Sequence, residues 1–158
     1  MTKINLVYGT GEVYNGFLTL NPFLEQETDS IKRCDIKNLN NFVDDGEVEE
    51  LIAINILEYF NANKIPEILS HWIKKVAING KIIISVTNVY DVARCFVNGI
   101  INLETFNGLV HGTNEKPYMV RRSCLTSTLI ENFLKSAGLK IMKRKINNYN
   151  VVIEAVRQ

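Results

Sequence analysis

The sequence has little cysteine, histidine or proline: three Cys, two His and three Pro in 158 residues. The cysteines Cys34, Cys95 and Cys124 are odd in number and show no C-x-x-C or Cys/His spacing. That pattern argues against both a disulfide framework and a zinc site. We therefore expect free thiols in a reducing compartment, and no bound metal.

The sequence also lacks a long apolar run and an excess of charge of one sign. The N-terminal segment enters a strand-like run without the features of a signal peptide, and no stretch approaches a membrane span. A formal net charge of +1 is too small to hold a polyanion, so nucleic acid is not an expected partner. The short basic clusters Arg121-Arg122 and Lys143-Arg144-Lys145 are expected to be solvent-exposed. These features favour a cytoplasmic protein with no membrane contact.

Hydrophobic residues make up 46% and charged residues 22% of the chain, the proportions of an ordinary globular protein. A chain of this length supports one hydrophobic core and is too short for two domains of usual size. We expect residues 1–158 to form a single domain.

Seven short apolar or alternating runs predict strands. Five precede the long connector that begins at Asn88: Ile4 to Tyr8, Phe17 to Leu20, Ile31 to Asp35, Leu51 to Asn55 and Lys81 to Thr87. The fifth of them is nearly continuous and β-branched, as in strands buried on both faces of a parallel sheet. The last two runs, Leu139 to Ile146 and Val151 to Val156, predict a C-terminal hairpin.

Two apolar stripes at helical spacing predict amphipathic helices. The first covers residues 65 to 76, with Trp72 as a core anchor and His71 on the exposed side. The second covers residues 125 to 137 and is closed by Gly138 as a left-handed cap.

The connector from Asn88 to Arg122 is long, as lids and binding loops are, and Val89 to Ile101 could form a helix within it. Strands that alternate with helices and end in a hairpin predict an α/β fold. Its sheet would be mostly parallel with an antiparallel edge.

Ligands of open α/β sheets bind beyond the carboxyl ends of the strands. The candidate site residues therefore end or directly follow the first four predicted strands: Tyr8, Gly9, Thr10, Gly11, Asn21, Asp35, Ile36, Ile54 and Asn55. Tyr14 stands where the third glycine of G-x-G-x-x-G belongs, and the loop from Gly9 to Gly16 is too short for a helix. A pyrophosphate site of the dinucleotide-binding kind is therefore not expected.

The order and spacing of these segments resemble the class I S-adenosylmethionine-dependent methyltransferases, in their short bacterial and phage type. INLVYG followed by GFLTLN resembles the first strand, glycine loop and second strand of that family, with Val7 at its first glycine and Asn21 at its closing acid. CDIKNLNNF, AINILEYF, KKVAINGKIIISV and KSAGLKI resemble later segments of the family in the same order. The resemblance covers nearly the whole chain and implies a three-layer Rossmann-like methyltransferase fold.

The resemblance also implies S-adenosylmethionine as the cofactor. It gives Asn21 the role of binding the ribose hydroxyls, Asp35 that of accepting from the adenine amine, and Ile36 that of packing on the ring. Gly9 and Gly11 would let the backbone approach the cofactor closely. The resemblance also implies that Tyr59, which stands where the family has a histidine, binds the methyl acceptor. His111 of the long connector is the other acceptor-side candidate. No catalytic base is assigned.

Two functions are compatible with these motifs. The first is a methyltransferase whose acceptor is a small molecule, a sugar or a peptide, enclosed beneath residues 88–122. Methylation of nucleic-acid bases is disfavoured because no Asn-Pro-Pro-Tyr or Asp-Pro-Pro-Tyr follows the fourth strand. The alternative is a catalytically inactive relative that keeps the fold as a binding or regulatory module. Its motivation is that Val7, Asn21, Tyr59 and Thr87 replace residues usual in the family.

Overall fold

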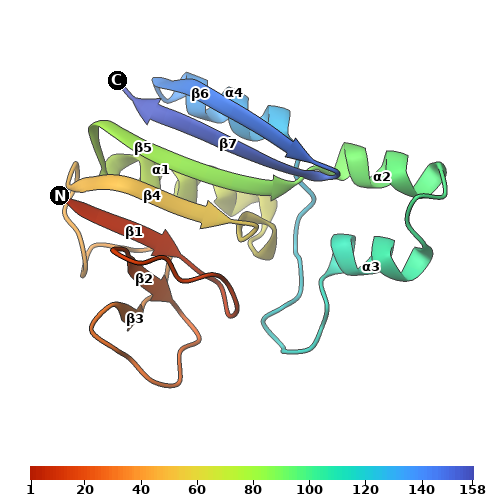
Figure 1. Ribbon diagram of the computed structural model, residues 1–158, viewed down its shortest axis with the longest axis horizontal. Coiled ribbons are helices and arrows are strands. Elements are labelled where there is room, and N and C mark those ends of the chain that lie inside the picture. Colours follow the sequence, from red (N-terminus) through yellow and green to blue (C-terminus); the bar gives the residue numbers. More distant parts are fainter.

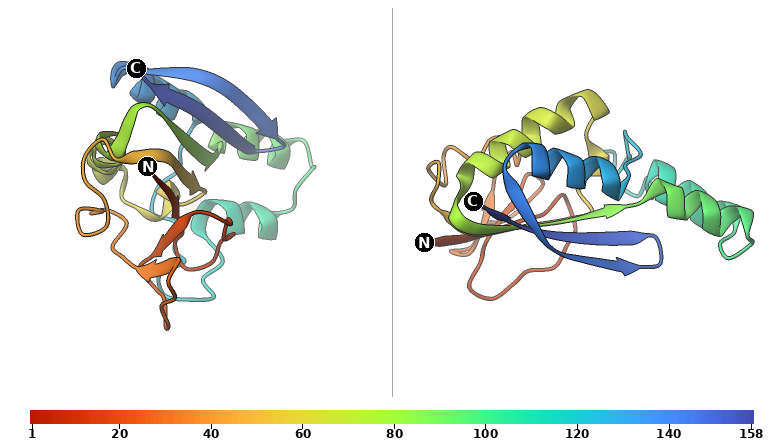
Figure 2. Two further views of the ribbon diagram at one scale, coloured as in Figure 1. Left: turned by 60° about the vertical axis from the view of Figure 1, so that its left-hand side comes forward. Right: turned by 90° about the horizontal axis from the view of Figure 1, so that it is seen from above.

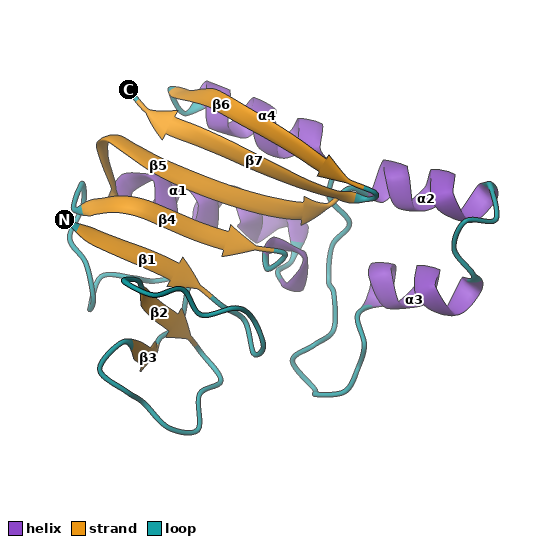
Figure 3. Ribbon diagram, in the orientation of Figure 1, coloured by secondary structure: helices purple, strands orange, loops and turns teal.

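The computed structural model describes residues 1–158 and is built around a seven-stranded sheet (Figures 1 and 3). The strands are β1 (Thr2–Leu6), β2 (Leu18–Asn21), β3 (Ile31–Arg33), β4 (Val48–Ile54), β5 (Val76–Thr87), β6 (Leu139–Asn147) and β7 (Asn150–Arg157). Their spatial order is β3-β2-β1-β4-β5-β7-β6. The first five are parallel, and β7 runs antiparallel to both β5 and β6. The predicted parallel sheet with a C-terminal antiparallel hairpin is confirmed.

Helices follow β4 and β5 but not the first three strands. They are α1 (Ile65–Lys75), α2 (Val89–Val97), α3 (Leu103–His111) and α4 (Ser127–Ser136), with short 3-10 turns η1 (Leu57–Tyr59) and η2 (Ala62–Lys64) before α1. Helices α1 and α4 cover one face of the sheet, whereas α2 and α3 extend past the carboxyl end of β5 (Figure 2). None of the helices is both long and apolar enough to span a membrane.

The hydrophobic core lies between the sheet and the helices α1 and α4. Alternate strand residues such as Ile82 and Ile153 are fully buried there, and so is Ile130 of α4. Trp72 of α1 is fully buried and donates its Nε1 hydrogen to the Ile36 carbonyl at 2.7 Å. Its predicted role as a core anchor is confirmed.

The other face of the sheet carries no helix (Figure 2). A polar row crosses it, with Lys3 and Lys81 at 3.5 and 3.1 Å from the carboxylate of Glu50. Part of the face is covered by the loop between β1 and β2, where Asn5 donates to the Glu12 carbonyl at 2.7 Å. The connections 7–17, 22–30 and 34–47 contain no helix. The first two are close to or below the shortest chain that can cross between parallel strands with a helix included.

Element boundaries agree with the sequence in most places. Gly138 follows α4 with φ of 83°, as expected of a left-handed cap. The strand β5 begins earlier than predicted, at Val76, so α1 ends at Lys75. The connector holds the predicted helix as α2 and a second, unpredicted helix, α3, which has no buried residue.

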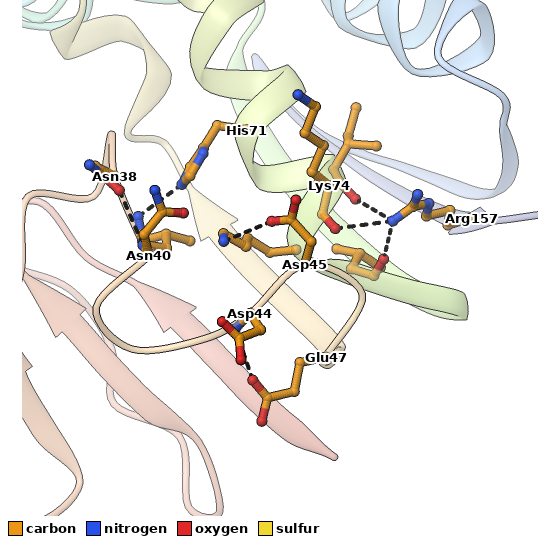
Figure 4. Close-up of polar contacts among 12 residues, drawn as sticks. Asn38, Asn40, Asp44, Asp45, Glu47, His71, Lys74 and Arg157 are labelled. Carbon is orange, nitrogen blue, oxygen red and sulfur yellow. Dashed lines mark hydrogen bonds and ion pairs between the residues drawn. The ribbon is translucent and has the colours of Figure 1, made fainter.

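Hydrogen bonds connect α1 to β7 at its C-terminal end and to the loop after β3 through His71 (Figure 4). Arg157 of β7 places Nη1 at 2.6 to 3.2 Å from three carbonyls at the end of α1 and the start of β5, those of Ile73, Lys74 and Val76. His71 accepts a hydrogen bond from the Leu39 amide at 2.8 Å. His71 is therefore half-buried, which corrects the expectation that it is exposed.

Candidate functional site

Two neighbouring cavities open where the strand order reverses, between β1 and β4. The β1–β4 cavity has a volume of about 370 Å³ and is lined mainly by the loop after β1 and the end of β4: Asn5, Leu6, Val7, Tyr8, Thr10, Gly11, Glu12, Tyr14, Ile54, Asn55, Ile56, Tyr59 and Arg121. The β2–β3 cavity, of about 360 Å³, is lined by Tyr8, Pro22, Phe23, Asp35, Lys37, Tyr59, Phe60, Asn61, Lys64 and Arg122. This is the position at which open α/β sheets bind ligands.

Tyr8 and Tyr59 line both cavities. Their rings stack with centroids 4.9 Å apart and an interplanar angle of 17°. Phe23 and Phe60 meet the Tyr8 ring edge-on, at 4.7 and 5.4 Å. Burial raises the pKa of the Tyr8 hydroxyl, so this group stays protonated at neutral pH. The stacked pair forms an aromatic partition between the two cavities.

Gly9 lies directly beneath the ring of Tyr118. Its φ of 84° is a conformation that favours glycine, and an added Cβ would lie 2.6 Å from Cε2 of Tyr118. The sequence predicted that Gly9 permits close approach of a cofactor. In the structure the group that approaches is a side chain from the long connector, and Gly9 lines neither cavity.

The side chain of Asn21 is buried and bonded to the backbone around it. Oδ1 accepts from the amides of Gly9 and Phe23, both at 3.1 Å, and Nδ2 donates to the Gly9 carbonyl at 2.9 Å. A carboxylate at this position could accept those bonds but could not donate the third. Asn21 therefore ties the glycine loop to the end of β2 instead of facing either cavity.

Val7 and Gly11 pack against each other. A Cβ on Gly11 would lie 3.0 Å from Cγ1 of Val7, so the absence of a side chain on Gly11 makes room for the branched valine. Val7 is buried, with only an edge on the β1–β4 cavity. The Val7 side chain therefore occupies the space beside Gly11, beneath the loop between β1 and β2.

The two residues that follow β3 have different environments. Asp35 is exposed at the β2–β3 cavity, where its carboxylate pairs with Lys37 at 3.6 Å. Ile36 is fully buried in the core and lines neither cavity. Asp35 is therefore placed to contact a ligand in the β2–β3 cavity, whereas Ile36 is not.

The end of β4 contributes Ile54 and Asn55 to the β1–β4 cavity, as predicted. Asn55 has a positive φ of 50°, and its Oδ1 accepts from the Ser85 hydroxyl at 2.9 Å. Thr10, Gly11 and Tyr59 also reach this cavity. His111 does not: it is exposed at the end of α3 and lines neither cavity.

A buried polar cluster beside the site was not predicted. Glu58 is 1% exposed, and its Oε1 accepts from the Thr87 amide at 2.6 Å while Oε2 has no partner. Burial raises the pKa of this carboxyl, and the nearby charge of Arg121 opposes that rise. Arg121 is half-buried, which corrects the expectation for this residue, whereas Arg122 and residues 143–145 are exposed as predicted.

Sequence reasoning missed Tyr118 and Arg121 because both lie in the long connector. No periodicity there indicated which residues turn inward. Phe23 was missed too, although a signal existed, since it follows Asn21 and Pro22 at the end of a predicted strand. No group of three or more His, Cys, Asp or Glu side chains is placed to hold a metal ion.

No protein-family model and no curated protein matches the sequence. Solved structures do match. A methyltransferase from Archaeoglobus fulgidus described as S-adenosylmethionine-dependent superposes with a TM-score of 0.61 at 12% identity, over 99% of this chain and 86% of that one. The 1,6-didemethyltoxoflavin-N1-methyltransferase of Burkholderia thailandensis, solved with 1,6-didemethyltoxoflavin and S-adenosylhomocysteine, gives 0.60 at 9% identity, over 99% and 72%.

An O-methyltransferase family protein from Burkholderia thailandensis is longer. It superposes with a TM-score of 0.56 at 15% identity over 81% of this chain, which spans 35% of that protein. These likenesses show that the chain has the Rossmann-like fold of the class I methyltransferases, as the motif resemblance predicted.

Proposed function

We propose that the protein is an S-adenosylmethionine-dependent methyltransferase acting on a small-molecule acceptor. The observation that carries the proposal is the position of the two adjoining cavities, at the carboxyl ends of β1 and β4 where the strand order reverses. Structures with this fold include one solved with S-adenosylhomocysteine and a small acceptor bound. Free cysteines throughout the chain support a reducing, cytoplasmic setting.

Several residues suit the adenosyl part of the cofactor. The exposed carboxylate of Asp35 can accept a hydrogen bond from the exocyclic amine of adenine. Tyr8 and Tyr59 offer aromatic faces between the two cavities. In the β1–β4 cavity, Thr10 and Gly11 offer a hydroxyl and an unobstructed backbone to the methionine part. When bound, the cofactor supplies a methyl group on a sulfonium for in-line transfer to a nucleophile.

One observation favours a second candidate, a methyltransferase-fold protein that binds a ligand without transferring a methyl group. Oδ1 of Asn21 already accepts from the amides of Gly9 and Phe23, so both of its lone pairs are occupied and it cannot also accept from the ribose hydroxyls. A bound ribose could form hydrogen bonds to the Asn21 oxygen only if those contacts with the loop broke.

Calorimetric titration with S-adenosylmethionine, S-adenosylhomocysteine and NAD tests the proposal. We expect saturable binding of both adenosyl ligands and none of NAD. A ligand at one hundred times its Kd adds about 2.7 kcal/mol to the stability of the folded state, which thermal unfolding detects. Failure of either adenosyl ligand to bind at millimolar concentration would contradict the cofactor assignment.

Turnover separates the two candidates. Release of S-adenosylhomocysteine from S-adenosylmethionine, measured across a panel of small-molecule acceptors, is expected of the enzyme. Binding of the cofactor without release in the presence of any acceptor would favour the second candidate.

A further inference from the structure

Arg121 lines the β1–β4 cavity with more hydrogen-bond donors than the protein uses. A guanidinium has five N–H donors. Nη1 is bonded to the Thr87 hydroxyl at 3.0 Å and to the Leu109 carbonyl at 2.6 Å. Nε and Nη2 make no hydrogen bond, and Arg121 takes part in no ion pair. Half of this side chain is therefore available to a ligand.

The two existing bonds, both from Nη1, tie the guanidinium to two different elements of the fold. Thr87 is the last residue of β5, and Leu109 lies in the last turn of α3. The backbone amide of Arg121 also donates to the His111 carbonyl at 2.9 Å, which closes the loop before it. A side chain held in this way loses little conformational entropy when it binds a ligand.

The positive charge of Arg121 is not neutralised by an acid of the cavity. Glu12 is exposed, and its Oε2 accepts from the Tyr14 hydroxyl at 3.0 Å. Glu58 is buried and forms no ion pair with Arg121. Burial raises the pKa of its carboxyl, against the nearby charge of Arg121. The remaining polar groups of the cavity are neutral amides and hydroxyls, those of Asn5, Thr10, Asn55 and the tyrosines.

We propose that Arg121 recognises a carboxylate or phosphate group on the acceptor. This deepens the proposed function and rests on it. Nε and Nη2 lie along one edge of the planar guanidinium, and that edge matches two oxygens of a carboxylate or phosphate. The cavity volume of about 370 Å³ suits a small molecule. The carboxylate of the cofactor itself is the other source of the same chemistry, so the experiment must separate the two.

The first arm uses simple anions. Benzoate and inorganic phosphate are titrated at constant ionic strength into the wild-type protein, and the Nε–H signal of Arg121 is followed by NMR. We expect saturable shifts of that signal. Arg121→Gln should weaken anion binding about tenfold or more. Arg121→Lys keeps the charge but not the planar pair of donors, so its affinity should lie between those of the wild type and Arg121→Gln. Lys116→Gln is the matched control, because it removes a charge from the same connector without touching either cavity.

The second arm uses ligands that share an adenosyl group. S-adenosylhomocysteine has a carboxylate and 5′-methylthioadenosine has none. Because Arg121 lines the cavity assigned to the methionine part of the cofactor, we expect Arg121→Gln to change the affinity for both ligands by the same factor. A loss confined to S-adenosylhomocysteine would assign the anion to the cofactor and overturn the proposal.

The proposal is also overturned if neither anion shifts the Arg121 signal, or if Arg121→Gln binds them as wild type does. Should Arg121→Gln fail to fold, the wild-type signal and Arg121→Lys decide the question. Absence of S-adenosylhomocysteine binding to the wild type would count against the methyltransferase assignment, whereas the anion titration would still report on Arg121.

Discussion

Phe23 and Tyr118 stack face to face, with ring centroids 3.7 Å apart and planes 6° from parallel. Phe23 follows β2, and Tyr118 belongs to the connector between α3 and α4. The contact holds the connector over Gly9 at the edge of the β2–β3 cavity. The chain thereby uses two of its own rings at the place proposed for the adenosyl group.

Replacing Tyr118 should separate stability from ligand binding. An aromatic pair contributes about 0.5–1.5 kcal/mol beyond area burial, so Tyr118→Ala is expected to lower the Tm by a few degrees. The affinity for S-adenosylhomocysteine should rise, because the ring no longer covers Gly9. Calorimetry and thermal unfolding measure the two effects, with Tyr118→Phe as the control that retains the stack. Weaker binding by Tyr118→Ala would mean that the ring supports the ligand.

Asn21→Asp tests the amide that ties the glycine loop to β2. The carboxylate would face the Gly9 carbonyl where Nδ2 now donates at 2.9 Å, leaving a buried acceptor without a donor. We expect a loss of about 1–3 kcal/mol in unfolding free energy by denaturant titration. Binding of S-adenosylhomocysteine should strengthen, since the acid can accept from both ribose hydroxyls.

The matched control for Asn21→Asp is Asn38→Asp. Asn38 is exposed and only accepts, from the Asn40 amide at 3.1 Å, so the carboxylate can replace it there. An unchanged affinity in Asn21→Asp would show that the loop stays closed on the bound ligand.

Asp35→Ala is expected to weaken binding of S-adenosylmethionine about fivefold to tenfold, through loss of one charge-assisted hydrogen bond to the adenine amine. Stability should hardly change, because the Asp35–Lys37 pair is exposed. Asp29→Ala removes an exposed acid that lines neither cavity and serves as the control. Equal calorimetric Kd values for the two variants would remove Asp35 from the site.

His71 should make stability fall in mild acid. Its pKa is lowered, first by burial and then by the charge of Lys75, and the neutral ring accepts from Leu39. The unfolded state therefore binds the proton more readily. The stabilisation is fully present above the unfolded pKa of about 6.5 and is lost as pH falls toward the folded pKa.

His71→Gln keeps an acceptor for the Leu39 amide without a titrating group. The Tm of the wild type, measured from pH 8 to 5, should fall more steeply than that of the variant. Parallel curves would show that His71 does not control this dependence. Glu58 acts in the opposite direction in both proteins because its pKa is raised, so it does not alter the comparison.

The strands, the mostly parallel sheet and the helices α1, α2 and α4 were predictable because apolar periodicity and turn residues are local properties of the sequence. Helix α3 was not, since its apolar residues have no face in the core and its pattern resembles that of a loop. At the site, the strand-end rule located Tyr8, Asp35 and Asn55. The roles of Asn21 and Gly9 depend instead on contacts that no spacing records, with Phe23 and with the distant Tyr118.

The helix-free face of the sheet determines which substitutions the strands will tolerate. In β7, Val151, Ile153 and Ala155 are fully buried, and the residues between them are only half-buried. Polar replacements at Val152 or Val156 should be accepted, whereas the same replacements one residue away should not. In a saturation mutagenesis scan of β7, tolerance to polar substitution should therefore alternate with a period of two residues. A strand in a sheet covered on both faces would be intolerant at every position.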